Sequence, residues 1–159
     1  MEGCIWVQFL SPKQKIRRTD KTGILMETVR TTYMDELRTE AEHVQSGNVI
    51  VTDAPVDNQG KGEFFSPTDM VAAALASCAM TIIGIAARDN GFSIQGAKAK
   101  TTKIMASDPR RISEIKIDYD FSGISLADDQ KRIIEFSANN CPVCLSLHPD
   151  LKRTIGIRY

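Results

Sequence analysis

The feature that most constrains this chain is one long apolar stretch near its middle, residues 66–88. Between Met70 and Ala87 only a serine, a threonine and a glycine are not apolar, and seven residues are alanine. A helix that is apolar on nearly every side either spans a membrane or lies in a protein core. Alanine contributes little to membrane insertion, whereas its small side chain lets neighbouring backbones pack closely. The stretch therefore predicts a core helix, with the thiol of Cys78 near its middle.

Both ends of this predicted helix carry residues typical of helix boundaries. Ser66 is placed as the N-cap, Pro67 occupies the first helical position, and Asp69 lies three residues after the cap. Gly91 follows the apolar residues, and glycine accepts the left-handed backbone conformation in which many helices end. The boundaries therefore agree with the apolar pattern.

The charge balance of the chain excludes two classes of partner. The 159 residues include 20 basic and 20 acidic side chains, so no net charge attracts nucleic acid or an anionic membrane surface. The amino terminus has no long apolar run after a basic start, so we expect no secretory signal and a cytoplasmic protein. In a reducing compartment, paired cysteines are more often redox-active or metal-binding than structural. We expect no cofactor.

The amino-terminal segment, residues 1–25, differs from the rest of the chain. It contains Pro12 and a cluster of basic residues, and no hydrophobic period is sustained through it. We interpret it as an extension preceding a natural start at Met26, in which Cys4 is incidental. Residues 26–159 are then expected to form a single domain.

Three strand candidates precede the helix. Polarity alternates through residues 29–33, and residues 38–45 continue as a second strand. The turn at residues 46–48 then leads into a third apolar strand, residues 49–52. A loop of residues 53–62 connects these strands to the helix.

The part of the chain after the helix predicts a hairpin, a second helix and a final strand. Residues 97–121 alternate clearly on both sides of a turn at Asp108-Pro109. Ser125 is placed as the cap of the second helix, and Ile155 begins the final strand. The predicted fold is therefore α+β, with antiparallel sheets wrapped around the central cysteine-bearing helix.

Four cysteines are present, and two of them form the motif Cys141-Pro142-Val143-Cys144. Taken alone, Cys78 is best interpreted as a small core residue. The second thiol pair strengthens a redox interpretation. Pro142 fixes the backbone at a helix entrance, where amide dipoles favour a thiolate at Cys141. Such a pair serves redox exchange, zinc binding or neither.

Zinc is the alternative that the cysteine motif leaves open. Cys141, Cys144 and His148 have offsets that share one helical face. Structural zinc sites use four ligands. The remaining candidates for a fourth ligand are His43, Cys78 and Cys4. Because no second clustered pair completes the set, we do not expect a metal site.

Two motifs at a fixed separation resemble a known family. The segment from Phe65 to Cys78, followed 63 positions later by Cys141-Pro142-Val143-Cys144, is similar to the OsmC/Ohr family of bacterial thiol peroxidases. The similarity covers about residues 26–159, including the order of the predicted elements. It implies an intertwined homodimer with its sites at the subunit boundary.

The resemblance also implies a reaction and its residues. In the family, an organic hydroperoxide oxidises the helix cysteine, the Cys-Pro cysteine resolves it as a disulfide, and a dithiol reductant resets the pair. These roles correspond to Cys78 and Cys141. An arginine on an early strand steadies the thiolate, and Arg38 is the nearest candidate. Cys144 is expected to be dispensable for forming the first disulfide.

One position departs from the family pattern. The peroxidases carry a glutamate directly after the helix-opening proline, where this chain has Thr68. Asp69 comes next, but nine positions at 100° per residue place it opposite Cys78, so it is better interpreted as a cap. Glu63 in the preceding loop is the other source of an acid. The departure resembles the broader OsmC-like subgroup.

Two functions therefore follow as expectations. As a peroxidase, the chain would bind an alkyl hydroperoxide against apolar residues on the thiol's side of the helix, among them Leu75, Val71 and Ile82. The alternative, favoured by Thr68, is a non-catalytic stress-response or small-ligand-binding domain with the same fold.

Overall fold

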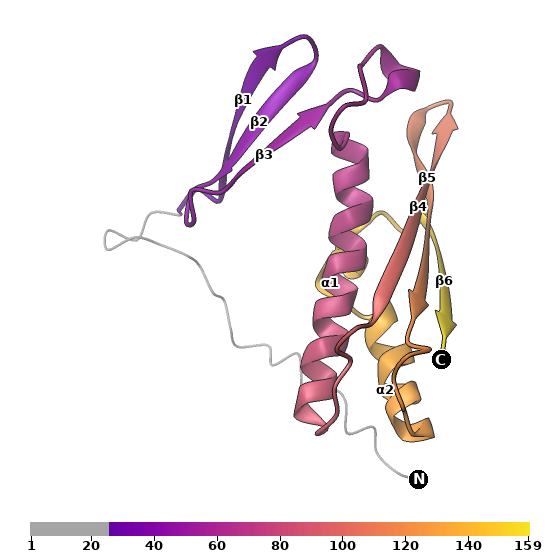
Figure 1. The fold of residues 1–159 in the computed structure, drawn as a ribbon. Coiled ribbons are helices and arrows are strands. Elements are labelled where there is room, and N and C mark those ends of the chain that lie inside the picture. Colours follow the sequence, from indigo (N-terminus) through magenta and orange to yellow (C-terminus); the bar gives the residue numbers. More distant parts are fainter. Residues whose placement is uncertain (1–25) are drawn as a thin grey trace.

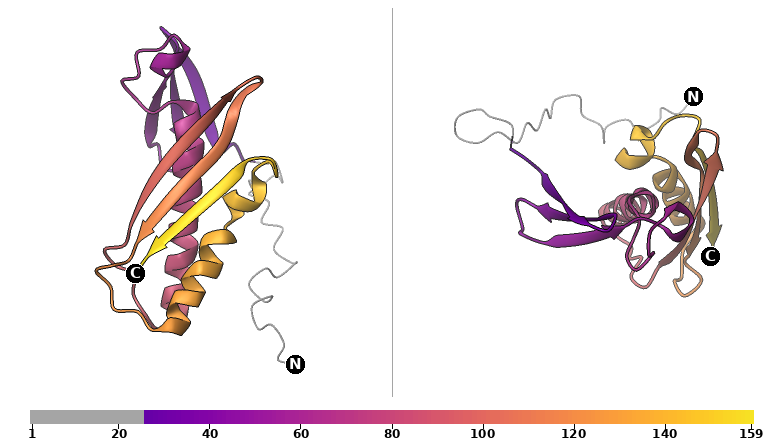
Figure 2. Two further views of the ribbon diagram at one scale, coloured as in Figure 1. Left: turned by 90° about the vertical axis from the view of Figure 1, so that its right-hand side faces the viewer. Right: turned by 90° about the horizontal axis from the view of Figure 1, so that it is seen from above.

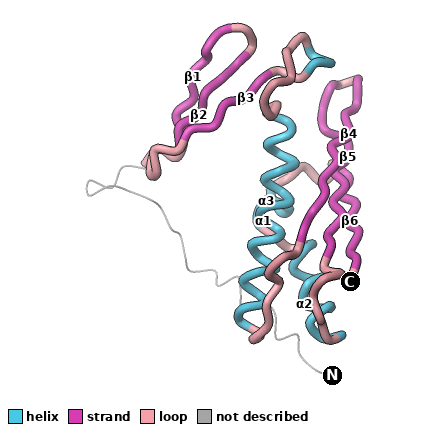
Figure 3. Tube along the Cα trace, viewed as in Figure 1, coloured by secondary structure: helices cyan, strands magenta, loops and turns pink. Residues whose placement is uncertain are grey.

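The computed structural model describes residues 26–159, and the predicted extension of residues 1–25 lies outside this range. Three strands, β1 (Val29–Asp35), β2 (Arg38–His43) and β3 (Val49–Asp53), precede the long helix α1 (Pro67–Asp89). After it come β4 (Lys98–Ser107), β5 (Arg110–Asp120), α2 (Asp128–Asn139), α3 (Pro142–Ser146) and β6 (Lys152–Arg158). Figures 1 and 3 show this order along the chain.

The strands form two sheets of three. The first sheet is antiparallel, in the order β1-β2-β3, and the second has the order β4-β5-β6. The predicted hairpin is confirmed, since β4 and β5 pair antiparallel. The α+β fold class is also confirmed, but β6 lies parallel to β5 rather than antiparallel. Helices α2 and α3 make this possible, because parallel neighbours need a crossover connection of this length.

The beginning of α1 is held as the sequence predicts. The Ser66 side chain accepts a hydrogen bond from the Asp69 backbone N–H at 3.1 Å, and Asp69 Oδ2 accepts from the Ser66 N–H at 2.9 Å. This reciprocal capping box satisfies two amide groups that would otherwise be unpaired at the helix start. Gly91, with a φ of 73°, follows the end of the helix in the expected left-handed conformation.

The core lies between one side of α1, the second sheet and α2. Viewed from above, α1 stands between the two sheets, with α2 and α3 beside it (Figure 2). Leu75, Ala79 and Ile83 face this core from α1, and all are almost fully buried. The sheet contributes alternate residues of β5 and the residue after it: Ile115, Ile117, Tyr119 and Phe121.

Within residues 26–159, the opposite side of α1 is not covered. Ala74, Ser77, Thr81 and Ile85 are exposed there, so in the single chain only one side of the predicted core helix is buried. Among the helices of residues 26–159, α1 alone is long and apolar enough to cross a membrane, with a mean hydropathy of 2.1. Core helices share that length and composition, and α1 packs against α2, α3, β4 and β5.

The first sheet extends from the amino-terminal end of α1 as an arm (Figure 1). Every residue of β1 is exposed, including Tyr33 at 62%. The arm is tied to the helix start, because the Asp53 N–H at the end of β3 donates to the Phe65 carbonyl at 3.1 Å.

The second helix begins later than predicted. Its N-cap is Ala127, so the placement of Ser125 as the cap is wrong. The Gln130 side-chain oxygen accepts a hydrogen bond from the Ala127 N–H at 3.0 Å. Only the N–H of the N-cap residue is satisfied in this way, since alanine has no side-chain acceptor for the amides of the first turn.

Candidate active site

Three thiols gather where α3 packs against α1. Cys78 lies in the middle of α1 and is half-buried, whereas Cys141 and Cys144 are buried at the start of α3. All three are free thiols. Cys78 packs against the buried cluster that contains Cys141, and the interaction between the two side chains raises the pKa of the Cys141 thiol, although 63 positions separate the residues. The structure therefore brings together the two cysteines that the sequence proposes as a redox pair.

Cys141 occupies the N-cap of α3, directly before Pro142. Its sulfur accepts a hydrogen bond from the Cys144 backbone N–H at 3.3 Å. Burial raises the pKa of the Cys141 thiol, and the interaction with Cys78 raises it further, outweighing the lowering by that amide. The expectation of a thiolate at Cys141 is therefore wrong, because desolvation exceeds the effect of the helix entrance. Cys141 is a proton-bearing thiol.

Cys144 has a cation as its neighbour. Its S–H donates to the Asn139 carbonyl at 3.1 Å, and the Arg153 guanidinium donates both to the Cys144 sulfur and to its carbonyl oxygen, the latter at 3.0 Å. Arg153 belongs to β6, on the same face as Ile155 and Ile157, which pack against the core. Arg153 is exposed overall, but the alternation of β6 is a signal that could have placed it on this face of the strand.

Tyr119 is a second site residue that the sequence analysis missed. It is 1% exposed, and its hydroxyl is buried without a hydrogen-bond partner among the described residues. Burial raises its pKa, and negative charge at Cys141, Cys144 and Cys78 would raise it further, so the phenol remains protonated. A free O–H donor therefore lies near all three thiols.

Arg38 lies in a separate cluster at the base of the arm. Its guanidinium donates to Asp53 Oδ2 at 3.2 Å and to Glu63, and lies 4.7 Å from the ring centroid of Phe64. The pKa of Arg38 is raised chiefly by the hydrogen bond that it donates to Glu63. Within residues 26–159 no hydrogen bond joins Arg38 to Cys78. The role of Arg38 as the cation beside that thiol stays a prediction.

The buried carboxylate of this cluster is Asp53, which is 1% exposed. The Glu63 backbone N–H donates to it at 3.0 Å and lowers its pKa, and Arg38 lowers it further. Glu63 therefore contacts both Arg38 and Asp53. Its role as the acid near the thiol stays a prediction.

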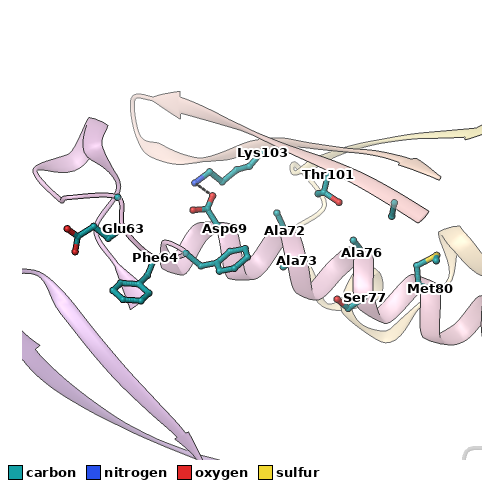
Figure 4. Close-up of a pocket in the computed structure, with 13 residues that line it drawn as sticks. Glu63, Phe64, Asp69, Ala72, Ala73, Ala76, Ser77, Met80, Thr101 and Lys103 are labelled. Atoms are coloured by element: carbon teal, nitrogen blue, oxygen red, sulfur yellow. Dashed lines mark ion pairs between the residues drawn. The ribbon is translucent and has the colours of Figure 1, made fainter. Parts of the chain in front are cut away.

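Thr68 and Asp69 share a lysine partner at the start of α1. Lys103 on β4 donates to the Thr68 hydroxyl at 2.7 Å and forms an ion pair with Asp69 at 2.8 Å (Figure 4). Burial raises the pKa of Asp69, but hydrogen bonds from Lys103 and Ser66 outweigh it and the net pKa is lowered. Thr68, which stands where the family's peroxidases carry a glutamate, is thus a neutral residue, and the Lys103 ammonium group lies beside it.

Two pockets lie on opposite sides of α1. The larger, about 910 Å³, is lined by Ala73, Ala76 and Met80, which helical geometry places opposite Cys78 (Figure 4). The smaller, about 480 Å³, is lined by Val71 on the thiol's side of the helix and by Leu147 beyond α3. Leu75 is 3% exposed and packs in the core, and neither pocket includes it.

The histidines do not join the cysteines. His148 is exposed and its ring nitrogen accepts from the Asp150 N–H at 3.2 Å. His43 bonds to the Ser46 hydroxyl. In the part of the chain that the structure describes, no three His, Cys, Asp or Glu side chains are grouped to hold a metal ion.

Comparison with known proteins identifies related folds. The model of the OsmC-like protein family matches residues 60–155. A candidate osmotic stress induced and detoxification response protein from Psychrobacter arcticus 273-4 is 53% identical, with a TM-score of 0.80, covering 84% of this chain and 96% of that one. The comparison with curated proteins finds no match.

More distant solved structures share the fold alone. An organic hydroperoxide resistance protein OsmC from Legionella pneumophila is 13% identical, with a TM-score of 0.68, covering 84% of this chain and 98% of that one. A candidate organic hydroperoxide resistance protein from Vibrio cholerae, with captopril bound in an active site, is 14% identical, with a TM-score of 0.65. The coverage in that case is 88% of this chain and 96% of the other.

Proposed function

The chain belongs to the OsmC-like protein family, and from this premise we propose that it is a thiol-dependent peroxidase that reduces organic hydroperoxides through Cys78 and Cys141. The observation that carries the proposal is the packing of Cys78 against the buried cluster that contains Cys141, close enough for the two side chains to interact. Among the cysteines of residues 26–159, Cys78 is half-buried, whereas Cys141 and Cys144 are buried. An accessible nucleophile beside a buried second thiol is the arrangement that reversible thiol oxidation requires.

The first step takes place at Cys78. Its thiolate attacks one oxygen of the hydroperoxide, a sulfur–oxygen bond forms, and the oxygen–oxygen bond breaks. The organic part leaves as an alkoxide and takes up a proton to become an alcohol. Cys78 is left as a sulfenic acid. The pocket beside Val71 and Leu147 would hold the alkyl group.

The second step uses the protonated state of Cys141. Its sulfur attacks the Cys78 sulfenic acid, a disulfide forms, and the hydroxyl group leaves as water with the thiol proton. Burial raises the pKa of Cys141, so the thiol carries the proton that leaves with the hydroxyl group as water. An external dithiol then reduces the disulfide by thiol–disulfide exchange.

Tyr119 would assist both steps as a hydrogen-bond donor. Its protonated hydroxyl has no other partner among the described residues and lies in the same buried region as the thiols. Such a donor stabilises negative charge that develops on sulfur or on the departing oxygen. Tyr119→Phe should therefore slow peroxide reduction while leaving the fold intact.

The protein is further proposed to act as a homodimer. Large apolar side chains are exposed on the arm and beside it, among them Val56 at 75%, Tyr33 at 62% and Phe65 at 61%. One side of α1 is also uncovered, and exposed apolar surface of this kind marks an interaction site.

A second copy would cover both surfaces. It would also supply Arg38 to Cys78 across the boundary. Light scattering should give about twice the chain mass of 17.6 kDa, and a monomer would exclude this assembly.

The peroxidase proposal is tested with cumene hydroperoxide and dithiothreitol as the reductant. Wild type should consume the hydroperoxide catalytically, Cys78→Ser should lose this activity, and Cys141→Ser should accumulate a Cys78 sulfenic acid that overoxidises. Cys4→Ser serves as the matched control, since that thiol lies outside the OsmC-like region. If Cys78 stays reduced while other thiols oxidise, the proposal fails.

A non-catalytic ligand-binding function is the second candidate. Thr68 at the glutamate position and the pocket of about 910 Å³ on the far side of α1 favour it. That pocket combines apolar walls with the Lys103 ammonium group at one end. The test measures the binding of an amphipathic anionic dye to a protein that proves inert to hydroperoxides. This function is supported if Lys103→Met weakens the binding and Cys78→Ser leaves it unchanged.

A further inference from the structure

We infer that Cys144 is a third redox thiol, which takes over the disulfide from Cys78 and leaves it as a Cys141–Cys144 bond, with Arg153 as the residue that stabilises the attacking thiolate. This inference rests on the proposed peroxidase function. It concerns what happens after the first disulfide has formed, and therefore which bond the external dithiol meets.

The first observation is the charge beside Cys144. The Arg153 guanidinium donates to both the sulfur and the carbonyl oxygen of Cys144. In residues 26–159 Arg153 forms no ion pair with a carboxylate, in contrast to Arg38 and Arg158. Arg153 is exposed overall, and its guanidinium group contacts Cys144 without a competing carboxylate among the described residues. A neighbouring cation favours the thiolate, which is the form that attacks a disulfide.

The second observation is the position of Cys141 between the other two thiols. Its side chain interacts with Cys78, and its sulfur accepts a hydrogen bond from the Cys144 N–H at 3.3 Å. Residues three apart at the start of a helical turn lie on neighbouring directions. Cys144 can therefore reach the Cys141 sulfur while Cys78 is bonded to it.

The third observation is the surroundings of Cys144. It is 4% exposed within the apolar core, and its sulfur also has two polar contacts, the Asn139 carbonyl and the Arg153 guanidinium. A small core residue needs neither contact. The two contacts fix the sulfur in position, with an acceptor for its proton and a cation beside it.

The exchange balances in atoms and electrons. Cys144 releases its proton to solvent and its thiolate attacks Cys141 in the Cys78–Cys141 disulfide. The Cys141–Cys144 bond forms, the Cys78–Cys141 bond breaks, and Cys78 departs as a thiolate. No outside oxidant is consumed, because one disulfide replaces another. The external dithiol afterwards reduces Cys141–Cys144.

The exchange changes the number of hydroperoxide equivalents that the reduced protein can consume. Because Cys78 returns as a thiolate, it can reduce a second hydroperoxide before any reductant acts. The reduced protein should therefore consume two equivalents, ending with a Cys141–Cys144 disulfide and a Cys78 sulfenic acid. Without Cys144 the Cys78–Cys141 disulfide persists, and consumption should stop at one equivalent.

The experiment titrates the full-length, fully reduced protein with cumene hydroperoxide in the absence of reductant, in a Cys4→Ser background. Cys144→Ser and Cys144→Ala are both tested, because serine keeps a donor for the Asn139 carbonyl if alanine disturbs folding. Dimedone labels the sulfenic acid, and mass spectrometry identifies the disulfide. Two equivalents with a Cys141–Cys144 bond, reduced to one equivalent in both variants, is the expected result.

Arg153 is tested by the rate of exchange. Arg153→Gln should slow the appearance of the Cys141–Cys144 bond by about tenfold or more, since it removes a charge-assisted hydrogen bond, and Arg153→Lys should restore part of the rate. Arg132→Gln on the exposed side of α2 is the matched control. If wild type stops at one equivalent with a Cys78–Cys141 bond, the inference is wrong while the peroxidase stands. If Cys78 does not react at all, the proposed function itself fails.

Discussion

The two sheets of this protein have the same number of strands and opposite environments. In the second sheet and the residue that follows β5, the inward side chains from Ile115 to Phe121 are at most 2% exposed. In the arm formed by the first sheet, every residue of β1 is exposed. Alternating polarity is present in both regions. Alternation therefore shows that a strand has two different faces, but it does not show which part of the assembly covers them.

The same division separates the proposed chemistry. The three thiols and Tyr119 lie in the packed region, and exposed Arg153 contacts one of them, Cys144. Arg38 belongs to the arm, and Glu63 to the loop that follows it. One chain thus brings the three thiols together, whereas the arginine expected from the family lies apart from them. This difference is the structural reason for proposing that the arm packs against a second copy and supplies Arg38 to its Cys78.

The largest expected effect is a difference in the free energy of unfolding between alanine substitutions at two phenylalanines. Phe121 is fully buried between the rings of Tyr119 and Tyr159, and Phe65 is 61% exposed at the base of the arm. Phe121→Ala should lower the free energy of unfolding by about 3–5 kcal/mol, because it leaves a cavity. Phe65→Ala should lower it by less than about 1 kcal/mol at low protein concentration. Urea denaturation checks both, and equal losses would contradict the contrast.

The second prediction asks which face of the arm is covered. Val49 and Ile50 are neighbours in β3, so their side chains point to opposite faces, and both are about half exposed, at 49% and 47%. If one face packs against a second copy, Val49→Lys or Ile50→Lys should weaken the dimer by about 2 kcal/mol, roughly thirtyfold in dissociation constant. The other substitution should have little effect. Sedimentation over a range of concentrations measures this, and two unaffected variants would exclude a dimer through β3.

Most of the fold could be predicted from the sequence. The α1 boundaries depend on local residues, Ser66 and Gly91, whose preferences the structure bears out. The β4–β5 hairpin follows from its alternation. The parallel placement of β6 could not be predicted, because strand direction depends on the route of α2 and α3 through space. The cap at Ala127 was missed since Gln130, not a preceding hydroxyl, supplies the acceptor.

The site was predictable only where motifs marked it. The resemblance identified Cys78 and Cys141, and their contact agrees with it. Arg153 and Tyr119 were missed because each looks like an ordinary member of a strand. Both residues matter to the site only because they lie near the thiols, and this proximity depends on how the strands and helices pack together. The protonated state of Cys141 was also missed, since burial cannot be judged from a local motif.

A third prediction compares two serines that both precede helices. The Ser66 hydroxyl accepts from the Asp69 N–H and also contacts Asp69 Oδ2 at 2.6 Å, whereas Ser125 is exposed and does not cap α2. Ser66→Ala should therefore lower the free energy of unfolding by about 1 kcal/mol. Ser125→Ala should change it by less than about 0.5 kcal/mol. Thermal denaturation distinguishes them, and an equal loss in both would mean that Ser125 has a role outside α2.

The smallest expected effect is a pH dependence that arises only in the packed region, at Cys141. Burial raises the pKa of this thiol above the ordinary value of about 8.5 for a free cysteine. Above pH ~8.5 the unfolded chain loses the thiol proton while the folded chain keeps it, so the folded state binds more protons. The free energy of unfolding should therefore fall as the pH rises above that value.

Denaturation of the reduced protein between pH 7 and 9.5 should show a shallower fall in Cys141→Ala. Tyr119 titrates too high to contribute in this range, because an unperturbed tyrosine has a pKa near 10 and burial raises it. Identical pH slopes in the two proteins would mean that the Cys141 thiol is not desolvated in the folded chain.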